Sequence, residues 1–232
     1  MSSATPPGAA ATGEPPAADR AYHHVKAGLL DGSYPDGELL SEGEIASDLN
    51  MSRTPVREAF LRLQGEGFLR LYPKRGALIV PVTPAEAQSV IEARFALERF
   101  ALDKIAAQGQ EAMQEVGAGL AAHPACDGSD LDDAQLHDTD RAFHAQLVSA
   151  AGNPVVTDLY DRLRDKQMRI TSTARTHTAR ARVAHQHTQL AEAVRSGDPE
   201  RAKTALREHL LGTVRAFGLT GGDYLDAPDT AP

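Results

Sequence analysis

One carboxylate and three imidazoles in the second half of the chain have the types and spacing of metal ligands. Asp140 and His144 are four residues apart, so on a helix both side chains project from the same face. His187 and His209 lie further along, each beside apolar positions that repeat with a helical period. Helix bundles build metal sites from side chains that face their interior, and imidazole with carboxylate suits zinc, nickel and similar ions. Three helices could therefore direct Asp140, His144, His187 and His209 at one point in the interior of a bundle, where a divalent metal could bind.

Such a ligand set would leave one or two coordination positions open for a small organic acid. The guanidinium of Arg94, on an earlier predicted helix, could pair with the carboxylate of that acid. An ion pair between Arg94 and Glu98, one helical turn away, is the alternative for the same side chain. Arg169 is a second candidate effector-binding residue. Each histidine taken alone would instead be a core or surface residue with a hydrogen-bond partner.

Two arginines near the start of the chain have the spacing of a DNA-contacting helix. Arg53 and Arg57 are four apart in the segment SRTPVRE, which begins at Ser52, so they share one helical face. Ser52 is a favourable N-cap residue for that helix. A polar run precedes this segment and an apolar-periodic run follows it, as in the second and third helices of a helix-turn-helix. Arginines at the start of a recognition helix can reach phosphates or the edge of guanine.

Capping and turn residues predict the elements that position these arginines. We expect three helices and a β-hairpin wing with a basic tip, at residues 20–30, 42–49, 53–66, 68–71 and 77–80. The whole chain has a net charge of −8, but the segment from Arg53 to Arg75 contains six basic residues and only two acidic ones. A local positive patch on an acidic protein suits a protein that must both bind and release DNA.

After residue 82 the sequence pattern is helical throughout. Thr83, Pro84 and Glu86 combine an N-cap, a proline in the first turn and an acidic residue at N3. We expect about six helices and no strand, at residues 84–107, 110–122, 132–151, 154–172, 180–196 and 199–218. The predicted fold class is therefore mainly α, with an N-terminal winged helix-turn-helix and a C-terminal all-α antiparallel helical bundle.

The composition suggests how the chain is divided. We expect disordered tails at residues 1–19 and 220–232, a DNA-binding domain at 20–82, and a helical effector- and metal-binding domain at 83–219. The first tail has neither the basic nor the apolar region of a signal peptide, and no apolar run is long enough to span a bilayer. The single cysteine, Cys126, excludes an internal disulfide framework. We therefore expect a cytoplasmic protein.

Residues 20–82 resemble the winged helix-turn-helix of the GntR family of bacterial transcription regulators. The shared marks are a Tyr-Pro-x-Gly turn, a Glu-Ile-Ala helix, the SRTPVREA segment, and then Leu-x-x-Glu-Gly and Arg-Gly. Many relatives carry an arginine directly before the Glu-Ile-Ala triplet, where this chain has Gly43, so that contact is not carried over. The resemblance implies DNA contacts from the recognition helix and from a wing tip in the minor groove, made by Ser52, Arg53, Thr54, Arg57, Lys74, Arg75 and Gly76.

The later residues resemble the FCD ligand-binding domain of the FadR subfamily of GntR regulators. The marks are Glu-x-Arg-x-x-Leu-Glu from Glu92, Asp-x-x-Phe-His followed by Ala-Gly-Asn, and His-x-x-Leu-x-x-Ala from His187 with a later His-Leu. Six helices rather than seven resemble the VanR-type branch more than the fatty-acyl-responsive type. In many members the matching aspartate and three histidines bind a divalent metal, and all four are present here.

The combined patterns predict a DNA-binding transcriptional regulator, most often a repressor in this family, and not an enzyme. Its partners would be double-stranded operator DNA and a small organic-acid effector. We expect a homodimer, because a single winged helix reads only a half-site. Two alternatives remain. One is a metal-dependent hydrolase with a DNA-binding appendage, although the sequence has no His-Glu-x-x-His segment. The other is a metal sensor without an organic effector.

Overall fold

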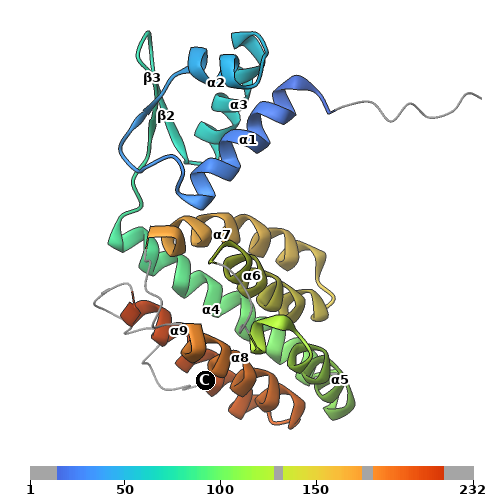
Figure 1. Cartoon of the computed structure of the whole chain (residues 1–232). Coiled ribbons are helices and arrows are strands. Elements are labelled where there is room, and N and C mark those ends of the chain that lie inside the picture. The colour runs from blue at the N-terminus through green and yellow to red at the C-terminus, as the bar shows by residue number, and fades with distance from the viewer. Residues whose placement is uncertain (1–14, 128–132, 174–179, 217–232) are drawn as a thin grey trace, which may run out of the picture. The chain divides into compact units, whose positions relative to one another are not determined.

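The structure is a computed structural model that describes residues 15–127, 133–173 and 180–216. The chain forms two compact units, and it passes from the first to the second between Val80 and Pro81 (Figure 1). Each unit has its own buried core, and we describe each separately. The C-terminal tail predicted at 220–232 lies outside the described residues.

The first unit is a winged helix-turn-helix, as predicted. Three helices accompany a small antiparallel sheet with the strand order β1-β3-β2 (Figure 1). The elements are α1 (Ala17–Asp31), β1 (Leu39–Leu40), α2 (Glu42–Asp48), α3 (Arg53–Gly65), β2 (Leu69–Tyr72) and β3 (Gly76–Ile79). The two-residue strand β1 was not predicted, because it is too short to show an alternating pattern; it pairs with β3.

Helix α1 begins earlier than the sequence indicated. Residues Ala17–Asp19 are helical rather than part of the predicted N-terminal tail. The backbone N–H groups of Asp19 and Arg20 donate to the carbonyl of Pro16, which starts the helix. The carboxylate of Asp19 also accepts a 2.6 Å hydrogen bond from Arg62 of α3. This contact joins residues 43 positions apart, so a local pattern could not reveal it.

The turn between β2 and β3 forms the tip of the wing and places a basic residue in an unusual backbone conformation. Lys74 has a φ of 63° and Gly76 a φ of 100°. A β-carbon at position 76 would lie 2.3 Å from the carbonyl oxygen of Leu40, so only glycine fits between this turn and β1. The predicted hairpin with a basic tip is therefore fixed by close backbone packing.

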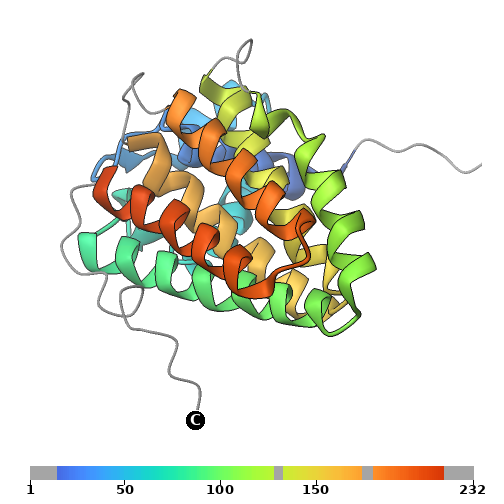
Figure 2. The same ribbon diagram turned by 90° about the horizontal axis from the view of Figure 1, so that it is seen from below.

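The second unit is all helical, as predicted. Its elements are α4 (Pro84–Ala106), α5 (Gln110–Ala121), the short 3-10 turn η1 (Pro124–Cys126), α6 (Asp133–Ala150), α7 (Pro154–Thr173), α8 (Arg180–Arg195) and α9 (Pro199–Ala216). Helix α9 lies beside α4 and α8, and α4 also contacts α6 and α7 (Figure 2). The Thr83 hydroxyl accepts from the backbone N–H of Glu86, which is the capping contact that the sequence predicted.

The core of this bundle combines apolar side chains from most of its helices. Its buried members include Phe95 and Leu102 of α4, Phe143 of α6, Leu190 of α8 and Leu206 of α9. Few polar residues of the described ranges are buried with them, and three of these, His144, His187 and His209, belong to the cluster described next, so the fold brings them together at some cost in desolvation.

Candidate metal centre and DNA-binding surface

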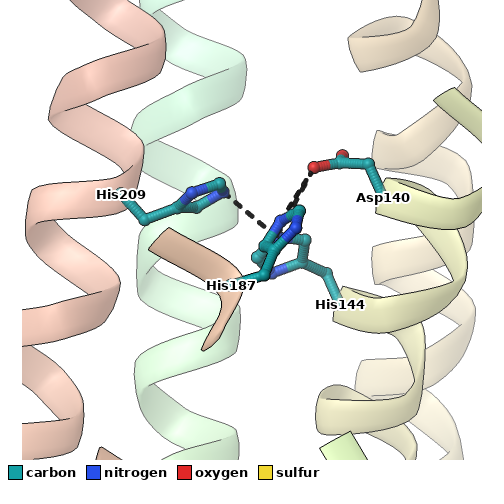
Figure 3. A group of neighbouring side chains, drawn as sticks. All are labelled: Asp140, His144, His187 and His209. Carbon is teal, nitrogen blue, oxygen red and sulfur yellow. Dashed lines mark hydrogen bonds and ion pairs between the residues drawn. The ribbon is translucent and has the colours of Figure 1, made fainter. Parts of the chain in front are cut away.

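The four predicted metal ligands lie together in the interior of the helical unit. Asp140 and His144 project from α6, His187 from α8 and His209 from α9, and the side chains point toward one another (Figure 3). One donor atom from each residue lies within 4.8 Å of all the others. The three imidazoles are almost completely buried, whereas the Asp140 side chain is one-quarter exposed. The cluster is thus accessible at its carboxylate side.

Three donor-atom separations match those of ligands around one ion, and a fourth, between Asp140 and His144, is longer. Nε2 of His144 lies 3.2 Å from Nε2 of His187 and 3.1 Å from Nε2 of His209. Oδ1 of Asp140 lies 3.1 Å from Nε2 of His187 and 3.8 Å from Nε2 of His144. Donor atoms about 2.1 Å from a zinc ion lie roughly 3.0 to 3.4 Å apart in octahedral or tetrahedral geometry.

Hydrogen bonds on the far side of two rings orient them for metal binding. Nδ1 of His144 lies 2.8 Å from Oε2 of Glu98, and Nδ1 of His187 lies 3.2 Å from the carbonyl oxygen of Ala125. Both partners are acceptors, so each Nδ1 carries the proton and donates. The Nε2 atoms of the two rings are then directed at each other, 3.2 Å apart. A cation bound between the Nε2 atoms would accept their lone pairs. It would displace any proton held between His187 and Asp140.

The electrostatic environment favours the metal-binding protonation states. Burial lowers the pKa of His144, and burial together with the neighbouring His187 and His144 holds the pKa of His209 well below its ordinary value. Burial by itself would raise the pKa of Asp140, but the contacts with His187, His144 and Arg94 hold it well below the usual range. Nδ1 of His209 is buried and has no hydrogen-bond partner among the described residues. Neutral imidazoles and an ionised carboxylate are the forms that bind a metal.

In this structure the ion pair of Arg94 with Glu98 does not exclude the predicted role of Arg94 in effector binding. The side chain is 1% exposed, and its Nε donates to Oε1 of Glu98, so the predicted ion pair exists. Its Nη2 is nevertheless buried without a hydrogen-bond partner in the described part of the chain. The same Glu98 carboxylate also bonds to His144, so Arg94 is joined to the cluster through one side chain. A buried N–H without a partner could donate to a carboxylate.

Sequence reasoning assigned Glu98 only as a partner of Arg94 and missed its other contacts. Its carboxylate also accepts from His144 and, at 2.7 Å, from the hydroxyl of Tyr160 on α7. Burial would raise the pKa of Glu98, but Arg94 and His144 lower it to about 2, so the group is ionised. These contacts span 46 and 62 residues, and no local pattern signals them.

Three further histidines of this region, and Arg169, are not among the predicted metal ligands. His185 is exposed on α8, two residues from His187. The side chain of His137 and the whole of His177 lie outside the described residues. Arg169 is buried on α7, and its role toward an effector stays a prediction.

The predicted DNA-contacting residues lie on exposed parts of the first unit. The side chains of Ser52, Arg53, Thr54 and Arg57 are exposed at the start of α3, and those of Lys74 and Arg75 at the β2–β3 turn, with Gly76 partly exposed. Ser52 occupies the N-cap position, but its hydroxyl makes no capping hydrogen bond, contrary to expectation.

No helix in the described ranges is long and apolar enough to cross a membrane. The fold and the side-chain cluster together define a class of protein, namely a winged-helix DNA-binding unit joined to a helical bundle with an internal polar site.

Comparison with known proteins identifies the family. Residues 17–79 match the bacterial regulatory proteins of the gntR family, and residues 89–212 match the FCD domain. A helix-turn-helix transcriptional regulator in an unstable DNA locus of Streptomyces ambofaciens is 32% identical over 187 residues, covering 75% of this chain and 73% of that protein. The probable D-xylose utilization operon transcriptional repressor of Paenarthrobacter nicotinovorans is 29% identical, covering 84% and 85% of the two chains. The chain therefore belongs to the GntR family of DNA-binding transcriptional regulators and carries an FCD domain.

A solved structure agrees with this fold. A GntR-type transcriptional regulator from Rhodococcus sp. RHA1 has a TM-score of 0.67 and 18% identity, covering 88% of this chain and 99% of that chain. At this level of identity the likeness concerns the fold alone. The family and the named relatives are transcriptional regulators rather than enzymes.

Proposed function

We propose that this protein is a transcriptional repressor whose helical domain binds one divalent metal ion and a small carboxylate effector, and that the effector changes its affinity for operator DNA. The protein acts in the cytoplasm as a homodimer on a palindromic site, since each winged helix reads one half-site. Residues 20–82 form the DNA-binding domain and residues 83–219 the sensing domain.

One observation carries the sensing half of the proposal. The donor atoms of Asp140, His144, His187 and His209 converge within 4.8 Å, beside the buried and unpartnered Nη2 of Arg94. Four protein ligands leave room in a coordination sphere for a further donor. A carboxylate satisfies both needs, because one oxygen can bind the metal and the other can accept from Arg94.

The DNA-binding half rests on the exposed basic residues of the first unit. Arg53 and Arg57 extend from the start of α3, and Lys74 and Arg75 extend from the wing. We assign base contacts in the major groove to the two α3 arginines, with Ser52 and Thr54 on nearby phosphates. The wing tip, with Gly76 at its base, contacts the backbone and the minor groove.

The connection between the two sites runs through α4. This helix carries Arg94 and Glu98, and it follows strand β3 of the wing after only four residues of chain. A metal ion, when bound, supplies a positive centre that anchors the effector carboxylate. The protein's own part is to hold that carboxylate at Arg94, so that effector binding favours one arrangement of α4. Coupling follows if the two arrangements differ in DNA affinity.

The proposal is tested with full-length protein stripped of metal by a chelator. Elemental analysis after zinc or nickel loading should give one ion per chain, and thermal-shift screening should find carboxylic acids that raise the melting temperature only when metal is present. Operator DNA recovered by genomic selection should then lose or gain affinity when the same acid is added. Turnover of the acid would instead indicate a hydrolase, and a DNA response to metal alone would indicate a metal sensor.

A further inference from the structure

We infer that Glu98 is a positioning residue for the metal site: its carboxylate holds the His144 ring in the tautomer and orientation that direct Nε2 toward the ion. The inference rests on the proposed metal site and adds a residue from a fourth helix, α4, that donates no ligand atom. It also gives Glu98 a role that its pairing with Arg94 does not explain.

The contact between Glu98 and His144 is short and completely buried. Oε2 of Glu98 lies 2.8 Å from Nδ1 of His144, and both side chains have 0% exposure. An ionised carboxylate can only accept hydrogen bonds, so the imidazole proton is on Nδ1 and the lone pair is on Nε2. The opposite tautomer would direct an N–H at the cluster and leave two acceptors facing each other at Nδ1, which is costly in a buried site.

The Glu98 carboxylate is itself held in place, so it can orient another side chain. Its other oxygen, Oε1, accepts from Nε of Arg94 and from the hydroxyl of Tyr160. The three donors come from α4, α6 and α7, and the carboxylate cannot rotate without breaking at least one of these bonds. The His144 ring is therefore oriented by a fixed acceptor rather than by packing alone.

This arrangement is that of a carboxylate–histidine–metal triad. A histidine that donates its second N–H to a carboxylate is a stronger metal ligand, and loss of the carboxylate typically weakens metal affinity by about 10- to 100-fold. The same carboxylate joins His144 to Arg94, so one residue supports both the metal ligand and the side chain proposed to hold the effector.

The decisive variant is Glu98→Gln in the full-length protein, with zinc affinity measured by competition with a chromophoric chelator. We expect the zinc affinity to fall by about 10- to 100-fold. Two controls accompany it. Glu92→Gln changes a carboxylate on the same helix that accepts a hydrogen bond from Gln88, and it should leave zinc affinity unchanged. Tyr160→Phe removes a donor from Oε1 but leaves the His144 contact, and it should cost less than Glu98→Gln.

A folded Glu98→Gln protein that binds zinc as tightly as the unchanged protein would overturn the inference, because a purely structural Glu98 would alter only the melting temperature. If this variant does not fold, the natural protein still decides the question. Nitrogen-15 spectra of the metal-free protein should show His144 protonated on Nδ1, with the resonance assigned from its absence in His144→Asn. Protonation on Nε2 would overturn the inference. If the natural protein binds no zinc, the metal proposal is refuted. The His144 tautomer would still show whether Glu98 orients that ring.

Discussion

The guanidinium of Arg53 on α3 lies against the α-carbon of Gly43 on α2. A β-carbon at position 43 would come within 3.2 Å of Nη2 and 3.5 Å of Nε of Arg53. The absence of a side chain at Gly43 therefore leaves room for the Arg53 guanidinium. This contact relates one unusual position of the sequence to the placement of a proposed base-reading residue.

Substitution of Gly43 should therefore weaken operator binding through Arg53. Gly43→Leu is expected to reduce the affinity for a selected operator by about tenfold, because a displaced arginine loses part of the roughly 1 to 3 kcal/mol of a bidentate base contact. Electrophoretic mobility shift at fixed salt measures this. Gly65→Leu on α3 is the matched control, since a β-carbon there meets no described atom within 4 Å. If Gly43→Leu and Gly65→Leu lose the same operator affinity, the effect of Gly43→Leu does not act through Arg53.

Removal of Arg57 should weaken specific operator binding without unfolding the protein. The side chain is exposed, so Arg57→Ala should leave the melting temperature nearly unchanged while operator affinity falls by about 10- to 100-fold. Arg201→Ala, an exposed arginine on α9, controls for the change in net charge. Retention of operator affinity in Arg57→Ala would reject the assignment of this residue to the DNA-reading face.

His187 should be required for metal retention. In His187→Ala the cluster loses one of its three imidazoles, and we expect substoichiometric zinc after gel filtration, measured by elemental analysis. The exposed His185 on the same helix provides the control, since His185→Ala should retain one ion per chain. Stoichiometric zinc in His187→Ala would mean that the ligand set is different.

Substitution of Arg94 should lower the affinity for the carboxylate effector more than the affinity for the metal. Arg94→Lys keeps a positive charge beside Glu98 but removes the unpartnered Nη2. A hydrogen bond to a charged group is worth about 1.5 to 3 kcal/mol, so carboxylate affinity should fall by roughly 10- to 100-fold while zinc affinity changes less. Calorimetry with an acid from the screen measures both. An unchanged acid affinity would leave Arg94 with only its ion-pair role.

The metal-free protein should lose stability in weak acid. The folded state depresses the pKa of His144 and His209, so below the ordinary histidine value of about 6.5 the unfolded chain binds protons that the folded chain does not. Their contribution to stability is complete above about pH 6.5 and decreases as the pH falls below it. The lowered pKa of Glu98 and Asp140 adds a second loss only below the ordinary carboxyl range.

Thermal melting of chelator-treated protein from about pH 7.5 to 5 tests this expectation. The melting temperature should decrease with falling pH, and replacement of His209 by asparagine should reduce that dependence. A melting temperature independent of pH across this interval would show that the buried histidines remain accessible to protons in the folded state.

Local patterns were sufficient wherever the relevant spacing lies within one element. The pairing of Asp140 with His144 and of Arg53 with Arg57 follows from helical periodicity, and the Thr83 cap follows from its own segment. The strand β1 and the early start of α1 were not predictable in this way, because β1 exists only through pairing with β3 and α1 is extended by contacts with α3. The Ser52 cap failed because a favourable residue type does not ensure the bond.

The sequence by itself determined which residue types occur at helical spacing, and hence the exposed arginine pair of α3 that we propose to read DNA, and the four candidate ligands. Only the tertiary structure decided how those ligands are protonated and what Arg94 is free to do. The physical reason is burial: the acceptors that set each imidazole tautomer, Glu98 and the Ala125 carbonyl, come from other parts of the chain. Whether a guanidinium N–H stays unpartnered depends likewise on which groups the folded bundle brings within reach of it.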